Sequence, residues 1–210
     1  DANGATLARL LRESGVAADF IQSASQPTIT KLRVLSRNQQ LIRLDTEDRY
    51  PLGDVSALPG MLERHLPKAS VCVFSDYAKG TLAEIQRLIT ICRQRGVAVL
   101  VDPKGSDFAR YRGASLLTPN LSEFEEVVGP TQGDDDIAER GGALREALDI
   151  DALLITHGER GMAVITAGFR LAFFLFEGDA AGATMTAALI GALLGFLVRN
   201  FPPAKIFMGD

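Results

Sequence analysis

The sequence predicts an α/β fold in which helices cover both faces of a parallel central sheet, with a small β-hairpin added to it. From residue 54 onward, short unbroken apolar runs alternate with segments of helical periodicity. Strands that are apolar on both faces are typical of a parallel sheet enclosed by helices. Residues 28–45 differ, because polar and apolar side chains alternate there around a polar turn. That pattern predicts an antiparallel hairpin with one face directed at solvent or at a ligand.

The composition indicates one folded unit. The chain has 210 residues, of which 47% are hydrophobic and 23% are charged, and this balance excludes a disordered or low-complexity chain. Its formal net charge of -4 argues against a duplex nucleic-acid partner, which requires a concentrated basic surface. Cys72 and Cys92 lie in apolar patterns without metal-type spacing. We expect both to be free thiols in a reducing compartment.

The first expected element is a short amphipathic helix. Leu7, Leu10 and Leu11 recur with helical spacing, and Gly15 follows as a stop signal. The chain opens at Asp1 without the charged and apolar regions of a secretory signal. We therefore expect a cytoplasmic protein.

The hairpin and the α/β part follow in order. In the hairpin, Thr30, Leu32 and Val34 are expected on one face and Lys31 and Arg33 on the other. Apolar runs predict strands at 71–74, 97–101, 115–117 and 152–155. Helical spacing predicts helices near 55–66, 82–92, 121–128 and 136–148.

One segment raises a membrane alternative. Residues 180–198 contain no ionisable side chain, and about 20 such residues can span a bilayer. The Gly191-x-x-x-Gly195 spacing is also found between membrane helices. Many small residues and the flanking Glu177 and Asp179 instead favour a helix packed inside an α/β protein. We expect no membrane partner.

Polar residues follow each predicted strand of the parallel sheet. The carboxyl ends of such strands form the ligand-binding edge of an open α/β fold. The four turns expected at this edge are 75–80, 102–105, 118–120 and 156–158. They bring lysines beside aspartates, as a phosphorylated ligand with a divalent cation requires. Each turn taken alone is more typical of a structural turn or cap, and it is their joint pattern that indicates a ligand site.

Three of these motifs have both a structural and a functional interpretation. Asn120 and Glu123 match a capping box, and Glu123 is also suited to hold a hydrated Mg²⁺. The glycines of Thr156-x-Gly158-x-x-Gly161 allow either a close nucleotide or a simple hairpin. Residues 179–184 form a small-residue loop before an apolar helix, typical of an anion site at a helix N-terminus or of a tight turn.

Long blocks of the sequence resemble the ribokinase-type carbohydrate kinases, and within them the heptose 7-phosphate kinase domains of bifunctional bacterial ADP-heptose synthesis proteins. The blocks that carry the resemblance are 27–45, 75–80, 101–114 and 117–123. The resemblance implies a ribokinase-like fold and ATP- and Mg²⁺-dependent phosphorylation of D-glycero-β-D-manno-heptose 7-phosphate at its anomeric hydroxyl. The product would be the 1,7-bisphosphate used for ADP-heptose and the lipopolysaccharide core.

The resemblance also implies roles for individual residues. Asn120, Leu121, Ser122 and Glu123 would contact ATP and its Mg²⁺, and Thr156, Gly158 and Gly161 would lie along the nucleotide. Gly182 and Ala183 would form the anion hole. The 28–45 hairpin would be the lid over the sugar phosphate and the contact of a homodimer.

Charged residues complete the expected site. Lys79 and Lys104 both follow strand ends beside an aspartate, so we expect them to contact phosphate. Asp76 is assigned to the substrate side. The hairpin cations would either receive the 7-phosphate or form a solvated face, and they are Lys31, Arg33, Arg37 and Arg43.

The chain departs from the family pattern at the catalytic base. The family loop is Asp-x-x-Gly-Ala-Gly-Asp-Thr with the last Asp as base, whereas here Ala183 runs directly into Thr184. The base is therefore expected to be missing between these two residues. Asp179 is the weaker alternative, because placing it at the base position loses the Thr184 match.

The family resemblance also implies a domain organisation and leaves two alternative functions. The family's first strand would lie before Asp1 and its closing helices after Asp210, so 1–210 correspond to part of a kinase domain. Neither His65 nor His157 lies in a His-x-Gly-His pattern, so no nucleotidyltransferase domain is expected. A catalytically silent nucleotide-binding homologue and a kinase of another sugar remain alternatives.

Overall fold

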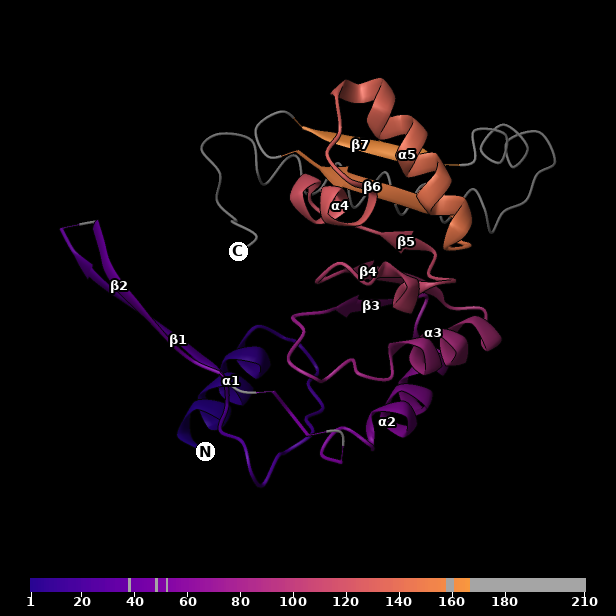
Figure 1. Cartoon of the computed structure of the whole chain (residues 1–210). Coiled ribbons are helices and arrows are strands. Elements are labelled where there is room, and N and C mark those ends of the chain that lie inside the picture. The colour runs from indigo at the N-terminus through magenta and orange to yellow at the C-terminus, as the bar shows by residue number, and fades with distance from the viewer. Residues whose placement is uncertain (38, 48, 52, 158–160, 167–210) are drawn as a thin grey trace.

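The computed structural model describes residues 1–37, 39–47, 49–51, 53–157 and 161–166. Its body is a five-stranded sheet in the order β3-β4-β5-β6-β7, and a separate two-stranded sheet is made by β1 and β2. Figure 1 shows the hairpin projecting from the body as a long arm, with the strands of the main sheet stacked beside it. The predicted combination of an α/β body and a small hairpin is confirmed.

The elements alternate along the chain as the sequence indicates. The strands are β1 (Thr30–Ser36), β2 (Gln39–Thr46), β3 (Val71–Ser75), β4 (Ala98–Asp102), β5 (Leu116–Leu117), β6 (Ala152–Thr156) and β7 (Met162–Thr166). The α-helices are α1 (Ala2–Glu13), α2 (Leu58–His65), α3 (Ile85–Gln94), α4 (Leu121–Val128) and α5 (Gly133–Ala147). Two short 3-10 helices are η1 (Leu66–Lys68) and η2 (Phe108–Tyr111).

The main sheet is parallel except at one edge. β3, β4, β5 and β6 pair in parallel, and the helices between them provide the crossovers that parallel strands need. β7 pairs antiparallel with β6, from Ala152↔Thr166 to Thr156↔Met162. The hairpin interpretation of residues 156–161 is therefore confirmed, since β6 and β7 are antiparallel neighbours.

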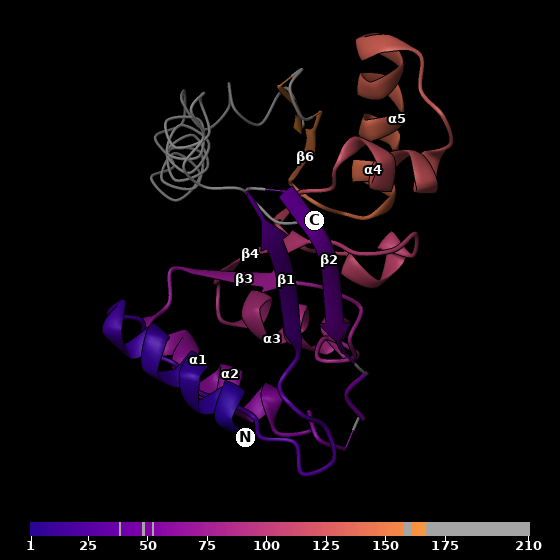
Figure 2. The same cartoon turned by 90° about the vertical axis from the view of Figure 1, so that its left-hand side faces the viewer.

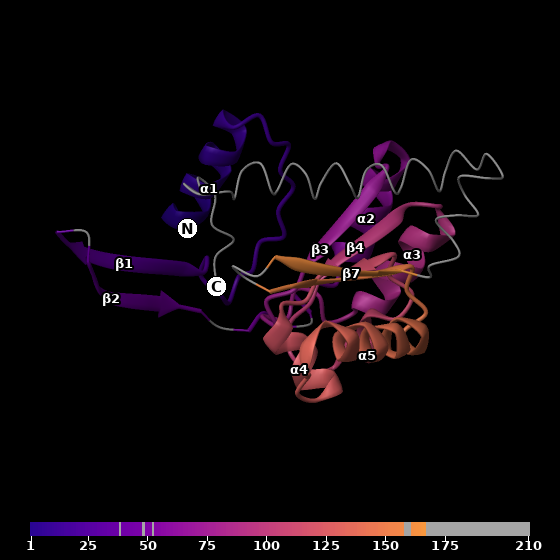
Figure 3. The same ribbon diagram turned by 90° about the horizontal axis from the view of Figure 1, so that it is seen from above.

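The main hydrophobic cluster of the described residues lies on one face of this sheet, and a smaller one, formed by Leu116, Ala152 and Leu154, lies on the other. Val99, Leu117 and Leu153 are fully buried in the main cluster, together with residues of α3, α4 and α5. Figure 3 shows α4 and α5 side by side along the face of the main cluster. Full burial of each such side chain stabilises the fold by about 1.5–3 kcal/mol. The core thus fixes the strands whose ends carry the polar turns.

Three helix starts differ from the sequence expectation, and the first is that of α2, which begins at Leu58 rather than at Val55. α3 begins at Ile85 rather than at Leu82, because residues 80–85 are first held by turn hydrogen bonds, including Ala83 N–H to Gly80 O. α5 begins at Gly133 rather than at 136. Its first turn contains Asp134, Asp135 and Asp136, whose negative charges stabilise a helix N-terminus.

The hairpin is exposed along nearly its whole length, and Figure 2 shows it and α1 on the same side of the molecule. Its register pairs Leu32 with Leu44 and Val34 with Ile42, so these four apolar side chains share one face. Lys31↔Asp45 and Arg33↔Arg43 lie on the other face. The predicted separation of faces is confirmed.

Within the described ranges, no helix is long and apolar enough to cross a membrane. The segment 180–198, which raised the membrane alternative, lies outside those ranges. Cys72 and Cys92 are free thiols, as expected. Burial raises the pKa of both, that of Cys72 to about 12, so neither is an activated nucleophile.

Candidate functional site at the carboxyl ends of the strands

The turns that follow the parallel strands meet at one edge of the sheet. Asp76 N–H donates to Asp102 O at 2.9 Å, which joins the ends of β3 and β4. Thr118 N–H donates to Val101 O at 3.0 Å, and Thr156 N–H to Pro119 O at 3.0 Å. The four strand ends are therefore hydrogen-bonded in series, as the sequence predicts.

Asp102 is the last residue of β4 and the carboxylate at the centre of this edge. Its Oδ2 accepts a hydrogen bond of 3.2 Å from Ser75 Oγ. Loss of hydration among the strand ends raises the pKa of Asp102, and the neighbouring Glu123 adds to this, whereas the Ser75 hydrogen bond opposes it. A cation bound at this edge would relieve that cost.

The N-terminus of α4 faces the same edge. Glu123 N–H donates to Asn120 Oδ1 at 2.9 Å, and Asn120 N–H donates to Glu123 Oε2 at 3.1 Å, which is a complete capping box. The structural interpretation of this motif is thus confirmed. It does not exclude a ligand role, because the cap leaves the first-turn N–H groups of Leu121 and Ser122 without an intrahelical acceptor.

Lys104 joins the turn after β4 to this capped helix. Its Nζ lies 2.8 Å from Glu123 Oε1. The side chain of Glu123 is only 11% exposed, whereas that of Lys104 is 54% exposed. The hydrogen bond that its ammonium group donates to Glu123 raises the pKa of Lys104. The ammonium group is thus charged, held in place and still open to an anion.

Lys79 lies in a different environment from Lys104. Its ammonium group forms an ion pair with Glu47, at the base of the hairpin. Tyr50 N–H also donates to Lys79 O at 2.7 Å, and a Cβ at Gly80 would lie 2.5 Å from Tyr50 O. Gly80 has a φ of 98°, so glycine is required where these two segments touch. Lys79 therefore connects the hairpin to the sheet.

The hairpin cations are largely balanced by carboxylates. Arg43 pairs with Asp45 at 2.9 Å, and Lys31 lies 3.9 Å from Asp45 and 3.7 Å from Glu47. Arg43 lowers the pKa of Asp45, and Lys79 lowers that of Glu47. Register brings Arg33 next to Arg43 on this face. Arg37 lies apart from them, at the hairpin turn, with a φ of 47°.

Asp76 is buried, with 5% of the residue exposed. Its Oδ1 accepts from Ala78 N–H at 2.7 Å, and its Oδ2 accepts from Tyr111 Oη at 2.8 Å. Arg110 Nη2 lies 3.6 Å from the same Oδ2. Sequence reasoning missed Tyr111 and Arg110, because they lie far along the chain from Asp76 and belong to no short motif.

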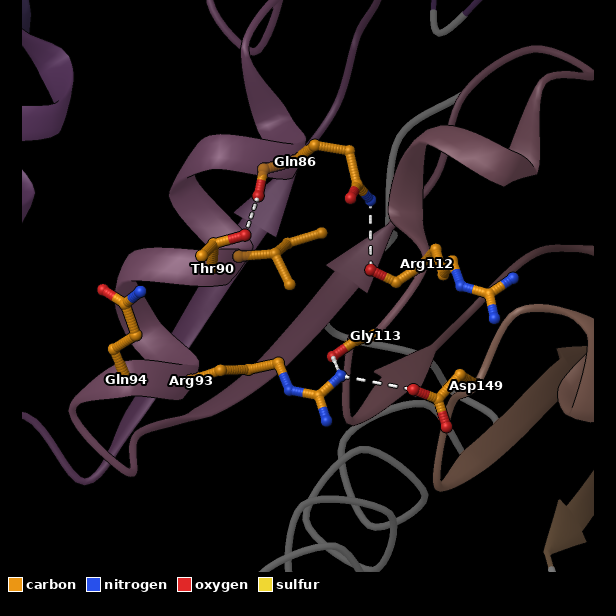
Figure 4. Close-up of a pocket in the computed structure, with 8 residues that line it drawn as sticks. Gln86, Thr90, Arg93, Gln94, Arg112, Gly113 and Asp149 are labelled. Carbon is orange, nitrogen blue, oxygen red and sulfur yellow. Dashed lines mark hydrogen bonds and ion pairs between the residues drawn. The ribbon is translucent and has the colours of Figure 1, made fainter.

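A cavity lined by residues of α3 and of the turns before β5 and β6 lies elsewhere in the described part of the chain. It has a volume of about 290 Å³ and is lined by residues that include Arg93, Arg112 and Asp149. Figure 4 shows Arg93 directed at Gly113 and Asp149, which precede β5 and β6. The cavity therefore opens at the amino ends of the strands. It is not part of the polar edge described above.

Other predicted site residues lie outside the described ranges. These are Gly158, Asp179, Gly182 and Ala183. Gly161 is described and begins the turn into β7, where its carbonyl accepts from His157 N–H at 2.8 Å. Across the described ranges, no group of three or more His, Cys, Asp or Glu side chains could hold a metal ion.

Curated relatives match most of the chain at high identity. The bifunctional protein HldE of Proteus mirabilis is 51% identical over 161 residues, which are 77% of this chain and 34% of that protein. The HldE of Erwinia tasmaniensis is 48% identical over 193 residues, which are 89% of this chain and 40% of that protein. The chain thus spans little more than a third of the length of these relatives.

Solved structures share the fold at low identity. A mutant phosphofructokinase-2 from Escherichia coli superposes with a TM-score of 0.65 at 17% identity, covering 80% of this chain and 56% of that one. Arabidopsis thaliana ribokinase complexed with ribose and ATP gives a TM-score of 0.60 at 19% identity, covering 80% and 55%. The fold is therefore ribokinase-like. The model of the pfkB family of carbohydrate kinases matches residues 1–195, and the chain belongs to that family.

Proposed function

We propose that the protein is a cytoplasmic sugar kinase that transfers phosphate from Mg·ATP to the anomeric hydroxyl of D-glycero-β-D-manno-heptose 7-phosphate. The observation that carries this proposal is the Lys104–Glu123 pair at the carboxyl edge of the sheet, beside the capped N-terminus of α4. The match to the pfkB family supports a carbohydrate kinase, and the resemblance of the blocks at 27–45, 75–80, 101–114 and 117–123 supports the choice of sugar. Residues 1–210 would form part of the kinase domain, with 28–45 as its lid.

The nucleotide phosphates would bind between Lys104 and the first turn of α4. A helix N-terminus offers N–H donors and the positive end of the helix dipole, and Lys104 adds a full positive charge. Leu121 and Ser122 would supply the N–H groups, while Asn120 and Glu123 hold the turn in shape. Thr156 lies next to Asn120 through a β-bridge, so the following turn would line the nucleotide.

The carboxylates at this edge fit a hydrated Mg²⁺. The ion needs few protein ligands and keeps several waters, and Glu123 with the nearby Asp102 offers oxygens of the required kind. Burial raises the pKa of Asp102 and the charge of Glu123 adds to this, so the Asp102 carboxylate would gain from a nearby cation. Bound Mg²⁺ would neutralise charge on the transferring phosphoryl group. Glu123 and Asp102 would hold its water shell.

The sugar phosphate would lie under the hairpin. Lys31, Arg33 and Arg43 share one hairpin face, and a dianionic 7-phosphate would compete with Asp45 and Glu47 for these cations. Arg37 would contribute from the turn. Lys79 would contact a phosphate only after its ion pair with Glu47 breaks. Phosphate binding by Lys79 would therefore be coupled to the position of the hairpin.

Homodimer formation would use the other hairpin face. Leu32, Ile42 and Leu44 are 58%, 49% and 51% exposed, and Val34 lies among them. A two-stranded ribbon with an exposed apolar face is marginally stable alone and gains from pairing with a second copy. This face supports a contact between two hairpins.

A second function is favoured by one sequence observation. Ala183 is followed directly by Thr184, so the Gly-Asp pair that holds the family's catalytic base has no counterpart, and Asp179 is the weaker alternative. Gly182 and Ala183 would still provide the anion hole. Without a base to accept the hydroxyl proton, the chain would bind nucleotide and transfer phosphate slowly or not at all.

A transfer assay with three acceptors tests both functions. The chain is incubated with Mg·[γ-³²P]ATP and heptose 7-phosphate, fructose 6-phosphate or ribose, and nucleotide binding is measured in parallel by calorimetry. Preferential labelling of heptose 7-phosphate supports the kinase. Binding without labelling of any acceptor supports the silent homologue, and preferential labelling of another sugar overturns the heptose assignment.

A further inference from the structure

A buried tyrosine connects the two sides of the candidate site. The ring of Tyr111 is fully buried in the main core and packs edge to face against Phe108, with 6.1 Å between centroids. Its hydroxyl nevertheless reaches the polar turns after β3 and β4. It donates to Asp76 Oδ2 at 2.8 Å and accepts from Lys104 N–H at 3.2 Å.

The Tyr111 hydroxyl acts as a donor toward Asp76 and as an acceptor toward Lys104. A phenol has one proton to donate, so when the hydroxyl donates to Asp76 its oxygen is left to accept the Lys104 N–H. Burial is the main cause that raises the pKa of Tyr111, so the proton stays on the phenol. The second oxygen of Asp76 accepts from Ala78 N–H. Asp76, the Tyr111 hydroxyl and the Lys104 N–H thus form a hydrogen-bonded bridge, and backbone N–H groups hold both of its ends.

The carboxylate at the other end of the bridge is buried and hydrogen-bonded at both oxygens. Asp76 is 5% exposed, and both of its oxygens already accept hydrogen bonds. Arg110 lies 3.6 Å from Oδ2, and its guanidinium carbon is 5.5 Å from the centre of the Tyr111 ring. A buried carboxylate compensated in this way stabilises one arrangement of its surroundings. Here those surroundings are the two turns.

We propose that Tyr111 is a positioning residue, which fixes the backbone of Lys104 through its hydroxyl and so places the Lys104 ammonium group for phosphate. The inference rests on the proposed function for the identity of the ligand only. Lys104 Nζ contacts Glu123 at one end of the residue, and Lys104 N–H contacts Tyr111 at the other. Asp76 acts in the same bridge, as the partner that orients the hydroxyl.

The bridge makes Tyr111→Phe the informative change, because it keeps the ring in the core and deletes only the hydroxyl. Tyr77→Phe is the matched control, since Tyr77 is 58% exposed and adjacent to Asp76. Asp76→Asn provides the conservative variant. An asparagine amide can donate to Tyr111 Oη while the hydroxyl donates to Lys104 O, which lies 3.3 Å away.

The first measurement uses the unliganded chain. Amide hydrogen exchange at Lys104 is compared between the unsubstituted protein and the Tyr111→Phe variant, with Val99 N–H in the core as an internal reference. We expect exchange at Lys104 to accelerate about three- to tenfold, as the loss of one hydrogen bond implies, with Val99 unchanged. Equal exchange at Lys104 in the two proteins overturns the proposal. This result does not depend on whether ATP is the ligand.

The second measurement is a double-mutant cycle on Mg·ATP affinity, by calorimetry at a temperature where every variant is folded. Tyr111→Phe and Lys104→Met should each weaken binding about three- to tenfold, and together no more than Lys104→Met alone. Asp76→Asn should bind more tightly than Asp76→Ala, and Tyr77→Phe should match the unsubstituted chain. Additive losses, or unchanged affinity in Tyr111→Phe, contradict action through Lys104. If the unsubstituted chain fails to bind Mg·ATP, the proposed function fails, and the exchange result still decides the bridge.

Discussion

Lys104 Nζ lies 2.8 Å from Glu123 Oε1, and this ion pair joins the turn after β4 to the N-terminus of α4. The two partners differ in exposure, since Glu123 is mostly buried and half of the Lys104 side chain is open. Glu123 also accepts from Asn120 N–H, so one carboxylate both caps a helix and orients a cation. Substitutions at Glu123 can separate these two tasks.

Glu123→Gln should preserve the helix cap and impair the metal site. Glutamine at this position of a capping box still accepts from the Asn120 N–H, so we expect the free energy of unfolding to fall by less than about 1 kcal/mol. Removing the charge should weaken Mg²⁺ dependence and nucleotide affinity by about tenfold. Glu123→Ala should lose both the cap and the charge. Urea unfolding and calorimetry with Mg·ATP measure the two effects, and unchanged affinity in Glu123→Gln would remove this residue from the metal site.

Asp102→Asn should stabilise the fold at neutral pH. The pKa of Asp102 is raised above its ordinary value of 3.8, so the charged carboxylate is less favourable in the folded protein than in the unfolded chain. That cost is present at neutral pH, shrinks as the pH falls through the raised pKa and vanishes below about 3.8. Asparagine avoids it and can still accept from Ser75.

The measurement is urea unfolding at several pH values from neutral down to 4. The stability advantage of Asp102→Asn should be largest at neutral pH and should shrink toward the acid end. Asp107→Asn, a change at an exposed position, is the control. If the advantage instead grew on acidification, the charged Asp102 carboxylate would not destabilise the folded protein.

Two adjacent glycines of α5 should respond differently to alanine. A Cβ at Gly141 would overlap Ile165 Cδ1 of β7, whereas a Cβ at Gly142 meets nothing within 4 Å. Gly142→Ala should gain up to about 1 kcal/mol from helix propensity. Gly141→Ala should lose about 1–3 kcal/mol, because Ile165 must move within a packed core. Thermal unfolding checks both, and equal effects at the two positions would contradict the packing of α5 on β7.

The exposed apolar face of the hairpin predicts a dimer that a single polar change dissociates. Leu44→Ser should shift the chain toward monomer in analytical ultracentrifugation, with little change in the unfolding of the main sheet, because Leu44 is 51% exposed. Gln39→Ser, at an exposed position on the opposite face of β2, is the control. A monomeric unsubstituted chain, or a dimer insensitive to Leu44→Ser, would exclude the hairpin contact.

Local signals explain which parts of the fold could be predicted from the sequence. The bounds of α4 are those expected, because the Asn120–Glu123 box marks its start and Gly129 follows its end. Helical spacing predicts too early a start for α3, because Leu82 is buried like a helical core residue although it lies in a turn. Periodicity reports burial, and burial alone does not distinguish a helix from a tight turn.

The convergence of the strand ends could also be predicted, since parallel topology alone brings them to one edge. The partners of individual side chains could not. Tyr111 is separated from Asp76 by 35 residues, and Lys79 from Glu47 by 32. Such contacts depend on how two turns approach each other in space. The sequence assigns Asp76 to the substrate side, but it does not reveal that this carboxylate is buried and hydrogen-bonded to Tyr111.

Hydrogen exchange with and without Mg·ATP tests whether the nucleotide binds at the carboxyl edge of the sheet. Binding there should slow exchange at 102–105 and 118–123, with little change around Arg93, Gly113 and Asp149 at the opposite edge. Protection confined to the cavity between those three residues, or no protection at either edge, would contradict binding at the carboxyl edge.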